Sequence, residues 1–469
     1  MKRAIGIAVI MVLCSNLSIA QESIGFTDSK DIQTLLEYRL PDWGYSNFIL
    51  NFNARNSGQS NQFGEFSIND HSSDFRLIPE HTLFRESESR LLEFNTALNL
   101  NYSAGTSDIE VQNGDIEQDN DLLRTNLNSS IVLKKYVGTN RFIHAENNVA
   151  LNYSSDKFEN RQGGALQDET VRYDRTFILN PRLGYGFGRI RNVGPIIRAI
   201  RLNERLGAIN NTGLDNGDLQ QAADQFTRFR GYQRNYDRPE KYFWRDLDRD
   251  ISSDLGSLDA FDLLYLTDVL DEAIGTRLEG WEVIGGLQFE YLNQLQRTES
   301  TPGTLNRSTN TDKELGAFVT ARWFKNTSLK QQWGLFFNSE LNYPLGEQDD
   351  PGPFSIDRNV VLNGGVSWLW TVTDRVLIQS SLSDSYSRTR YEADDSTSDV
   401  YENYSGWENR LALNAGVNLF IENSLQLNIS ANPFLIHAGT TDNEHILNFR
   451  SLRWQLAAGL RYYFSRNLY

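Results

Sequence analysis

The sequence predicts an all-β fold, a transmembrane up-and-down antiparallel β-barrel of about 14 strands with a helical periplasmic insertion. Segments in which every second residue is apolar recur through most of the chain, as expected of strands that turn one face toward lipid. Short and long polar connections alternate between these segments, as in an up-and-down barrel. One long connection near the middle of the chain loses this alternation and takes on helical spacing.

The first 20 residues have the organisation of a secretory signal peptide. The charged start, Met1–Arg3, precedes an apolar run that ends at Cys14, and Ala20 completes a short region of small residues. We therefore expect an exported mature chain that begins at Gln21. Cys14 is the single cysteine, so this mature chain is expected to form neither a disulfide nor a thiolate metal site. Leu13 stands where a lipoprotein signal needs a small residue, which disfavours a lipid anchor.

Hydropathy and charge limit the function classes. Mean hydropathy is −0.49, and no run after the signal approaches the roughly 20 consecutive apolar residues of a membrane-spanning helix. A barrel is compatible with this value, because only alternate residues of each strand face lipid. The formal net charge of −16 disfavours general binding of nucleic acid or other polyanions.

Fourteen segments show the two-residue alternation. In the clearest, Leu98 and Leu100 alternate with Asn99 and Asn101, which predicts one apolar and one polar face. The predicted strands are Tyr45–Asn56, Ser73–Arg85, Arg90–Ser103, Leu122–Tyr136, Arg141–Ser154, Glu169–Phe187, Gly280–Gln296, Lys313–Lys325, Leu329–Leu345, Asn359–Thr373, Val376–Arg388, Ser405–Ile421, Leu425–His437 and Glu444–Phe464.

The connections between these strands alternate in length. The predicted tight turns are Val137–Asn140, Asn326–Ser328, Asp374-Arg375 and Glu422–Ser424. The predicted polar loops include Asp108–Asn120, Thr298–Asp312, Glu347–Phe354 and Tyr391–Glu402. Outer-membrane barrels place short turns in the periplasm and long loops outside, so both termini are expected in the periplasm. We interpret the acidic loops as solvated rather than as calcium or ligand sites.

The helical connection divides the chain. We expect residues 1–20 to be the signal peptide, 21–187 to form strands one to six, 188–279 the helical insert and 280–469 strands seven to fourteen. Pro195 suits the first turn of one helix, and Ser257 is the predicted N-cap of a second. Because the insert joins strands six and seven on the turn side, it is expected to be periplasmic.

Charge within the insert is polarised. Residues 189 to 249 hold twelve Lys and Arg against eight Asp and Glu, whereas residues 250 to 279 hold eight acids against Arg277 alone. In the first interpretation the two parts pack together and pair their charged rims. In the second, an arginine group binds an anionic partner such as a cell-wall polymer, an acidic glycan or an acidic protein. The candidate partner-binding residues are Arg198, Arg201, Arg205, Arg228, Arg230 and Arg234.

The strand faces opposite the apolar face are polar and mixed in sign. A barrel of about 14 strands is wide enough that side chains need not fill it, so these residues could line a water-filled passage. They could instead pair across the lumen and close it, and the sequence leaves both alternatives open. The candidate lumen-facing residues are Glu93, Asn99, Glu146, Arg172, Asp174, Arg322, Glu340, Arg410, Arg453 and Arg461.

No motif indicates an enzyme, a metal or a cofactor. His437 and His445 flank acidic residues in the last loop, but no Gly-x-Ser-x-Gly motif accompanies them. Asp246, Asp248 and Asp250 lack the glycine and the final glutamate of a calcium loop. We therefore expect these aspartates to cap helices and to pair with nearby arginines.

Two stretches resemble known proteins. Gly459, Tyr462 and Phe464 resemble the C-terminal assembly signal of Gram-negative outer-membrane β-barrels. The stretch Gly184–Ile190, followed by Val193, is similar to uncharacterised outer-membrane proteins in which a strand enters a helical periplasmic insert. This second likeness implies a family of unknown function and carries no catalytic or binding residues.

Together these patterns predict an outer-membrane barrel that is a porin-like channel or a binding barrel for hydrophilic solutes. The alternative is a non-transport membrane anchor or assembly protein, whose insert docks a periplasmic protein or the cell wall. Outer-membrane lipid is the partner common to both, and neither involves nucleic acid.

Overall fold

The computed structural model describes residues 29–63, 66–110, 115–210, 213–253, 255–272, 274–301, 303–346, 354–373, 376–393, 404–422, 425–441 and 448–462. The predicted signal peptide, residues 1–20, and Phe464 lie outside these residues. None of the described helices is long and apolar enough to cross a membrane.

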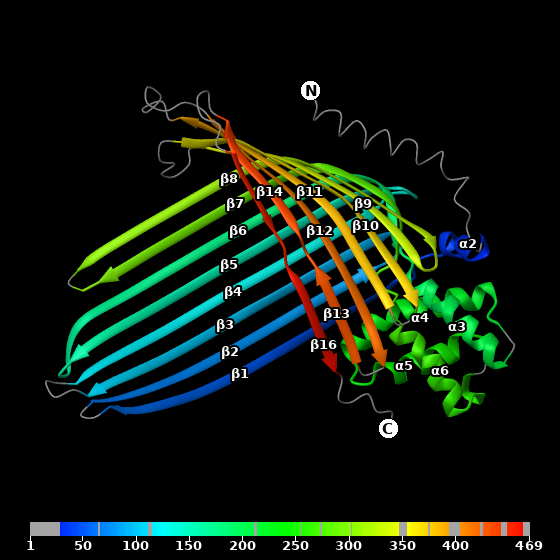
Figure 1. The fold of residues 1–469 in the computed structure, drawn as a ribbon, viewed down its shortest axis with the longest axis horizontal. Coiled ribbons are helices and arrows are strands. Elements are labelled where there is room, and N and C mark those ends of the chain that lie inside the picture. Colours follow the sequence, from blue (N-terminus) through cyan, green and yellow to red (C-terminus); the bar gives the residue numbers. More distant parts are fainter. Residues whose placement is uncertain are drawn as a thin grey trace.

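The described strands form one antiparallel sheet whose order follows the chain, as Figure 1 shows. Each strand from β1 to β12 pairs with the next strand in sequence. The strands are β1 (Trp43–Phe63), β2 (Phe66–Glu86), β3 (Arg90–Glu110), β4 (Ile116–Tyr136), β5 (Arg141–Gln162), β6 (Ala165–Asn192), β7 (Leu278–Ser300), β8 (Thr304–Ser328), β9 (Gln331–Pro344), β10 (Phe354–Thr373), β11 (Val376–Ala393), β12 (Tyr404–Glu422), β13 (Leu425–Ala431), β14 (Phe434–Thr441), β15 (Asn448–Arg453) and β16 (Leu456–Tyr462).

These sixteen elements make fourteen passes of the chain. β13 and β14 both pair with β12 and are separated by only Asn432 and Pro433, so they are one interrupted strand. β15 and β16 pair with β14 and β13 and form the last pass. Proline has no N–H for a sheet ladder, which accounts for the interruption. The predicted up-and-down β-barrel class is confirmed; among the described residues, β1 pairs with β2 alone and β16 with β13 alone.

Two of the predicted loops were wrong. In the range Asp108–Asn120, β3 continues to Glu110 and β4 begins at Ile116. Thr298–Asp312 likewise belongs largely to β7 and β8. Polar side chains suggested loops here, but backbone ladder bonds form whatever the side chains are, so these strand pairs extend beyond the apolar band.

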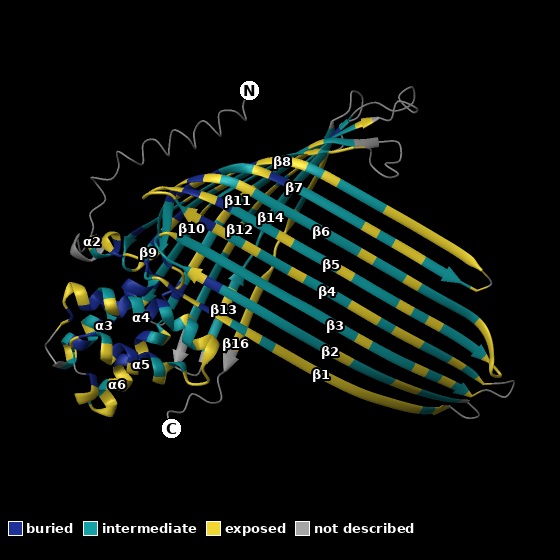
Figure 2. Ribbon diagram, turned by 180° about the vertical axis from the view of Figure 1, so that it is seen from behind, coloured by how far each residue is buried: buried dark blue, intermediate teal, exposed yellow. Residues whose placement is uncertain are grey.

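Each strand presents one apolar and one polar face. Leu98 of β3 lies beside Leu127 of β4, which lies beside Leu151 of β5. On the opposite face, Lys134 of β4 meets Glu282 of β7, three strands away. Side chains so far apart in a sheet meet only on its concave side, so the apolar face is the convex one. Figure 2 shows alternating exposed and intermediate positions along these strands.

A matched pair of arginine substitutions tests the two faces. Leu98→Arg is expected to cost about 2–4 kcal/mol of folding free energy near the bilayer midplane, because it places a charge in lipid. Asn99→Arg should cost much less, since its side chain points to the opposite face. Folding titrations into lipid vesicles measure both values. Equal tolerance of the two substitutions would contradict a lipid-facing apolar side.

The helices pack into a separate hydrophobic core at the end of the sheet where β1 begins and β16 ends (Figure 1). They are α2 (Ser29–Glu37), α3 (Gly194–Asn210), α4 (Asn216–Asn235), α5 (Pro239–Asp250), the 3₁₀ turn η2 (Leu255–Ser257) and α6 (Ala260–Asp271). We call residues 193–277, from α3 to the start of β7, the insert. Pro195 lies in the first turn of α3, as predicted.

The predicted N-cap Ser257 was wrong. It ends η2, and the N-cap of α6 is Asp259, whose carboxylate accepts hydrogen bonds from the N–H groups of Phe261 and Asp262, both at 2.8 Å. An aspartate at this position satisfies N–H groups that a helix start leaves unpaired, and its charge suits the helix dipole.

Helix α2 lies within residues 21–187 but packs with the insert. Leu35, Tyr38 and Leu40 are buried in the core of the insert. The Tyr38 hydroxyl lies 2.8 Å from Thr227 Oγ1, and this burial raises the pKa of Tyr38. The N-terminal segment therefore connects the insert to β1.

Candidate functional site

The concave face of the sheet carries a buried charge cluster near the turn-side end. Glu282 of β7, only 2% exposed, accepts hydrogen bonds from Lys134 Nζ at 2.9 and 3.0 Å. Arg322 of β8 donates to the same carboxylate. One buried carboxylate thus holds two cations from strands on either side of it. We call Lys134, Glu282 and Arg322 the buried ion cluster.

A second polar group lies on the same face. Glu340 of β9 accepts from Arg182 Nη2 of β6 at 3.1 Å and from Asn338 Nδ2 at 3.1 Å. Gln288 of β7 donates to Asn342 Oδ1 at 2.6 Å. Because these bonds link β6, β7 and β9, they hold the polar face of this wall in one arrangement.

Apolar side chains pack beside these polar groups. Phe142, Ile284 and Phe318 form a buried cluster from β5, β7 and β8. The Arg182 guanidinium lies 5.6 Å from the centre of the Phe318 ring. A Cβ on Gly186 would lie 2.3 Å from Phe142, so only glycine leaves room for this ring. The turn-side end of the concave wall is therefore filled where β5, β7 and β8 contribute these rings and side chains.

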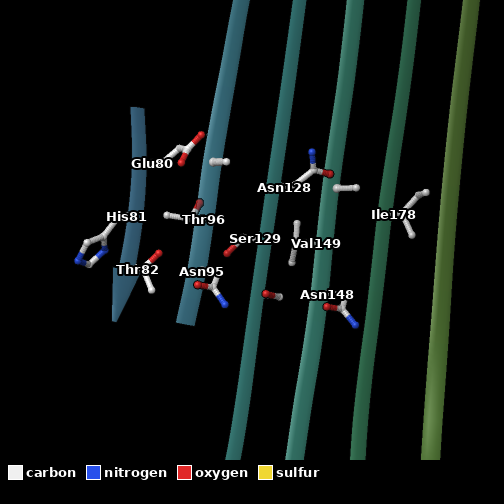
Figure 3. A pocket seen from close by; sticks show the side chains of 13 residues that line it. Glu80, His81, Thr82, Asn95, Thr96, Asn128, Ser129, Asn148, Val149 and Ile178 are labelled. Atoms are coloured by element: carbon white, nitrogen blue, oxygen red, sulfur yellow. The ribbon is translucent and has the colours of Figure 1, made fainter. Parts of the chain in front are cut away.

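Farther along the wall lies a hollow of about 470 Å³, which Figure 3 shows. Its lining mixes amides, hydroxyls and one carboxylate with the apolar residues Ala97, Val149, Ala150 and Ile178. It is lined by Glu80, His81, Thr82, Asn95, Thr96, Ala97, Asn128, Ser129, Ser130, Asn148, Val149, Ala150 and Ile178. No lysine or arginine is in this lining, so the hollow offers hydrogen-bonding groups with little positive charge.

Three predicted lumen residues lie in the filled region. Glu146 accepts from Asn148 Nδ2 at 3.1 Å and lies 3.5 Å from His144 Nε2. Arg322 belongs to the buried ion cluster, and Glu340 to the second polar group.

The other predicted lumen residues are spread along the sheet. Glu93 accepts from Asn95 at 3.0 Å, and Asn99 accepts from Arg76 at 3.3 Å. Arg172 and Asp174 form an ion pair at 2.9 Å. Arg410 lies 4.4 Å from the centre of the Phe434 ring. In register, Arg453 lies opposite Phe434, and Arg461 opposite Gln426.

Lys134, Arg182 and Glu282 are absent from the predicted set. Strand alternation places Lys134 on the same face as Asn126 and Asn128, so this signal was present in the sequence. What the sequence does not contain is the contact between Lys134 and Glu282, which are 148 residues apart.

The insert contacts concave-facing side chains on widely separated strands. The Arg230 guanidinium of α4 lies 5.8 Å from the ring centre of Tyr45 in β1 and 5.5 Å from that of Phe84 in β2. After α6, a Cβ on Gly275 would lie 2.9 Å from Leu369 of β10. Because β2 and β10 are eight strands apart in the sheet, a body that contacts both lies across the turn-side mouth.

Buried polar contacts fasten the insert to this mouth. Arg277, fully buried, donates through Nη2 to the Lys330 carbonyl and to Thr371 Oγ1, both at 2.8 Å, and through Nε to the Ile274 carbonyl at 3.1 Å. Burial lowers the pKa of Arg277 to about 10. Arg277 thereby joins the end of the insert to the β8–β9 turn and to the last part of β10.

A second fastening lies at the β2–β3 turn. Glu88 accepts hydrogen bonds from Arg189 and, at 3.1 Å, from Arg191 at the end of β6. It also accepts from the backbone N–H of Leu40, which follows α2, at 2.9 Å. One carboxylate therefore ties the strand that enters the insert to the N-terminal segment.

The six predicted partner-binding arginines do not form one surface. Arg198 donates to the carbonyls of Leu270 at 2.9 Å and Glu272 at 3.3 Å, at the C-terminal end of α6. Arg205 pairs with Glu272 at 2.8 Å. Burial lowers the pKa of Arg198. These side chains hold α3 against α6. Their positive charges lie at the C-terminal end of α6, where the helix dipole is negative and stabilises cations.

Arg201 lies with Arg198 and Arg205 on α3, where it pairs with Glu204 at 2.8 Å and lies 4.0 Å from Glu272. The remaining three lie elsewhere. Arg230 lies against β1 and β2, as described above, and Arg228 and Arg234 lie on α4.

The aspartates near the end of α5 have structural contacts. Asp246 accepts from the Tyr232 hydroxyl at 2.7 Å and pairs with Arg245 at 2.9 Å. Asp248 accepts from the N–H groups of Leu255 and Gly256 at 2.9 and 3.2 Å. Within the described residues, no group of three or more His, Cys, Asp and Glu is placed to hold a metal ion.

The histidines of the last loop are only partly described. His437 packs edge-on against Trp407, with ring centres 4.8 Å apart. His445 lies outside the described residues.

No protein-family model matches the chain. No curated protein matches it either. It is similar to the translocator domain of the autotransporter NalP from Neisseria meningitidis, with 10% identity over 93% of each chain and a TM-score of 0.22. It is also similar to the ferric yersiniabactin uptake receptor FyuA from Yersinia pestis, with 6% identity over 91% of this chain and 73% of that one and a TM-score of 0.35.

A third similar structure is the outer membrane protein OprD from Pseudomonas aeruginosa, with 8% identity over 91% of this chain and 97% of that one and a TM-score of 0.17. Values this low carry nothing about function over to this chain.

Proposed function

We propose that the protein is an outer-membrane barrel that passes or binds hydrophilic solutes, with the insert across its periplasmic mouth. The observation that carries this proposal is the division of one sheet into an apolar convex face and a polar concave face. A convex apolar face suits lipid, and a polar interior suits water and dissolved solutes. Such a barrel needs no catalytic group, metal or cofactor.

The concave face favours solutes of low charge. The hollow of about 470 Å³ presents amides and hydroxyls, which exchange hydrogen bonds with neutral polar molecules. The buried ion cluster holds two cations and one carboxylate, a net charge of +1, and Glu80 in the hollow contributes one negative charge, so the two groups together are neutral. We therefore propose little preference between cations and anions.

Electrical recording from planar bilayers tests this function with the purified full-length protein. Stepwise, ohmic currents with weak ion selectivity are the expected result. If the folded protein inserts into the bilayer but conducts no current, the proposal of a channel is wrong. Calorimetry with neutral sugars would then test whether the barrel binds solutes without passing them. Failure of both measurements would remove the solute-handling proposal.

The second candidate is a membrane anchor or assembly protein that acts through the insert. It is favoured by the insert having a hydrophobic core of its own, completed by α2, which suits a docking body held at a membrane surface. Silent bilayers, together with a periplasmic partner that is lost on deleting residues 192–276, would favour this candidate over the first.

A further inference from the structure

Helix α6 is apolar on both sides, although only one side is buried. Leu266 and Val269 are fully buried against the rest of the insert. On the other side, Phe261 is 83% exposed, Leu264 43% and Tyr265 45%. These three positions are spaced i, i+3 and i+4, so they lie on one face of the helix. Neighbouring exposed apolar side chains on one helix face have the character of a contact surface.

Acidic residues surround this face. Residues 251–276 contain no lysine or arginine, and α6 itself carries Asp262, Asp268 and Asp271 after its N-cap Asp259. Arg205 of α3 borders one end of this face, where its guanidinium lies 3.8 Å from Asp268 and 4.9 Å from the centre of the Tyr265 ring. The exposed N-terminal part, around Phe261 and Asp262, therefore combines apolar area with negative charge.

We propose that the exposed face of α6 docks a protein segment that presents apolar side chains flanked by lysine or arginine. Phe261, Leu264 and Tyr265 would lie against the apolar side of the segment, in the manner of an amphipathic helix packed on a helical surface. The basic flanks would face Asp259 and Asp262, which sets the orientation of the segment and speeds its association. This inference depends on the proposed function only for the periplasmic location of the insert.

Charge selects this occupant over two others. In a twofold dimer the same surface meets itself, so two α6 helices would bring Asp262 and Asp268 against their own copies. An anionic lipid surface would repel the acidic residues at the N-terminal part of the face. A segment with apolar side chains and basic flanks complements both the apolar and the acidic parts of the face.

The test uses the full-length protein in nanodiscs of zwitterionic lipid, with empty nanodiscs as the background. The probes are two fluorescent helical peptides with the same leucine face, one flanked by lysines and the other by glutamates. Fluorescence anisotropy is expected to show at least ten-fold tighter binding of the lysine peptide, weakened by added salt. Phe261→Ser should reduce this affinity at least ten-fold. Because Phe261 is exposed, its replacement leaves the core of the insert unchanged.

Tyr236→Ser is the matched control, since Tyr236 is another exposed aromatic of the same insert, at the end of α4. It should leave the affinity for the lysine peptide unchanged. Equal affinity for the two peptides, or binding unaffected by Phe261→Ser, would overturn the proposal. A concentration-dependent dimer that Phe261→Ser abolishes would also overturn it and assign the face to a second copy. Bilayer conductance does not enter any of these outcomes, so failure here and failure of the channel are distinguishable.

Discussion

Replacing Glu282 by glutamine is expected to lower the free energy of unfolding by about 3–5 kcal/mol, the range found when one partner of a buried ion pair is removed. The reason is that Lys134, only 7% exposed, loses the carboxylate that compensates its charge and accepts its hydrogen bonds. Arg322 loses the same acceptor. Urea unfolding from lipid vesicles, followed by tryptophan fluorescence, measures the difference.

Glu299→Gln is the control on the same strand. Glu299 pairs with Arg297 near the far end of β7, where both side chains are well exposed, so its loss is expected to cost at most about 1 kcal/mol. The double substitution Lys134→Met and Glu282→Gln should recover part of the loss, because it removes the uncompensated cation. If Glu282→Gln and Glu299→Gln unfold at the same urea concentration, the buried ion cluster does not stabilise the barrel.

Arg277→Ala is expected to release the insert from the turn-side mouth. The substitution removes the hydrogen bonds of a buried guanidinium to Lys330 and Thr371. Hydrogen bonds of charged groups contribute about 1.5–3 kcal/mol each, so losing both should raise the undocked fraction roughly hundred- to ten-thousand-fold. Arg277→Lys should release it too, because one ammonium group cannot reproduce the fork of the guanidinium.

Spin labels on Lys241→Cys in α5 and Thr373→Cys beside the β10–β11 turn report this motion. A docked insert gives one narrow distance distribution, and release adds a broad second one. Arg234→Ala, on an exposed arginine of α4, should keep the narrow distribution and is the control. A narrow distribution in Arg277→Ala would mean that other contacts, such as Glu88 with Arg191, hold the insert by themselves. If the barrel conducts, Arg277→Ala should also raise its conductance.

Alternation along single strands was sufficient to predict the passes of the barrel. Leu98 and Asn99 point to opposite faces because successive residues of a strand always do, and this property needs no knowledge of neighbouring strands. Strand ends were less predictable. Residues 104–110 and 116–121 are polar, yet they form a ladder from Ala104 with Asp121 to Ile109 with Ile116. Their pairing continues because the strands are already adjacent, which polarity does not reveal.

The helical connection shows the same limit. Its spacing predicted helices between β6 and β7, and its charges left two interpretations open. The structure shows Arg198 and Arg205 at the C-terminal end of α6, about 70 residues away in the chain. That Phe261 is exposed could be learned only from the structure. Apolar spacing in a sequence predicts that a helix side is buried, but it does not show whether another element packs against that side.

The sequence by itself determined the local periodicities: fourteen two-faced strands, a helical connection and a polar inner face. Only the tertiary structure decided which inner residues meet, as Lys134 meets Glu282 across three strands and Tyr38 meets Thr227 across 189 positions of the chain. It also decided that the insert lies across the mouth, through Arg277 and Gly275 on one side and Arg230 on the other. The physical reason is that periodicity is a property of neighbouring residues, whereas these contacts depend on the curvature of the sheet and on where a separate core docks against it.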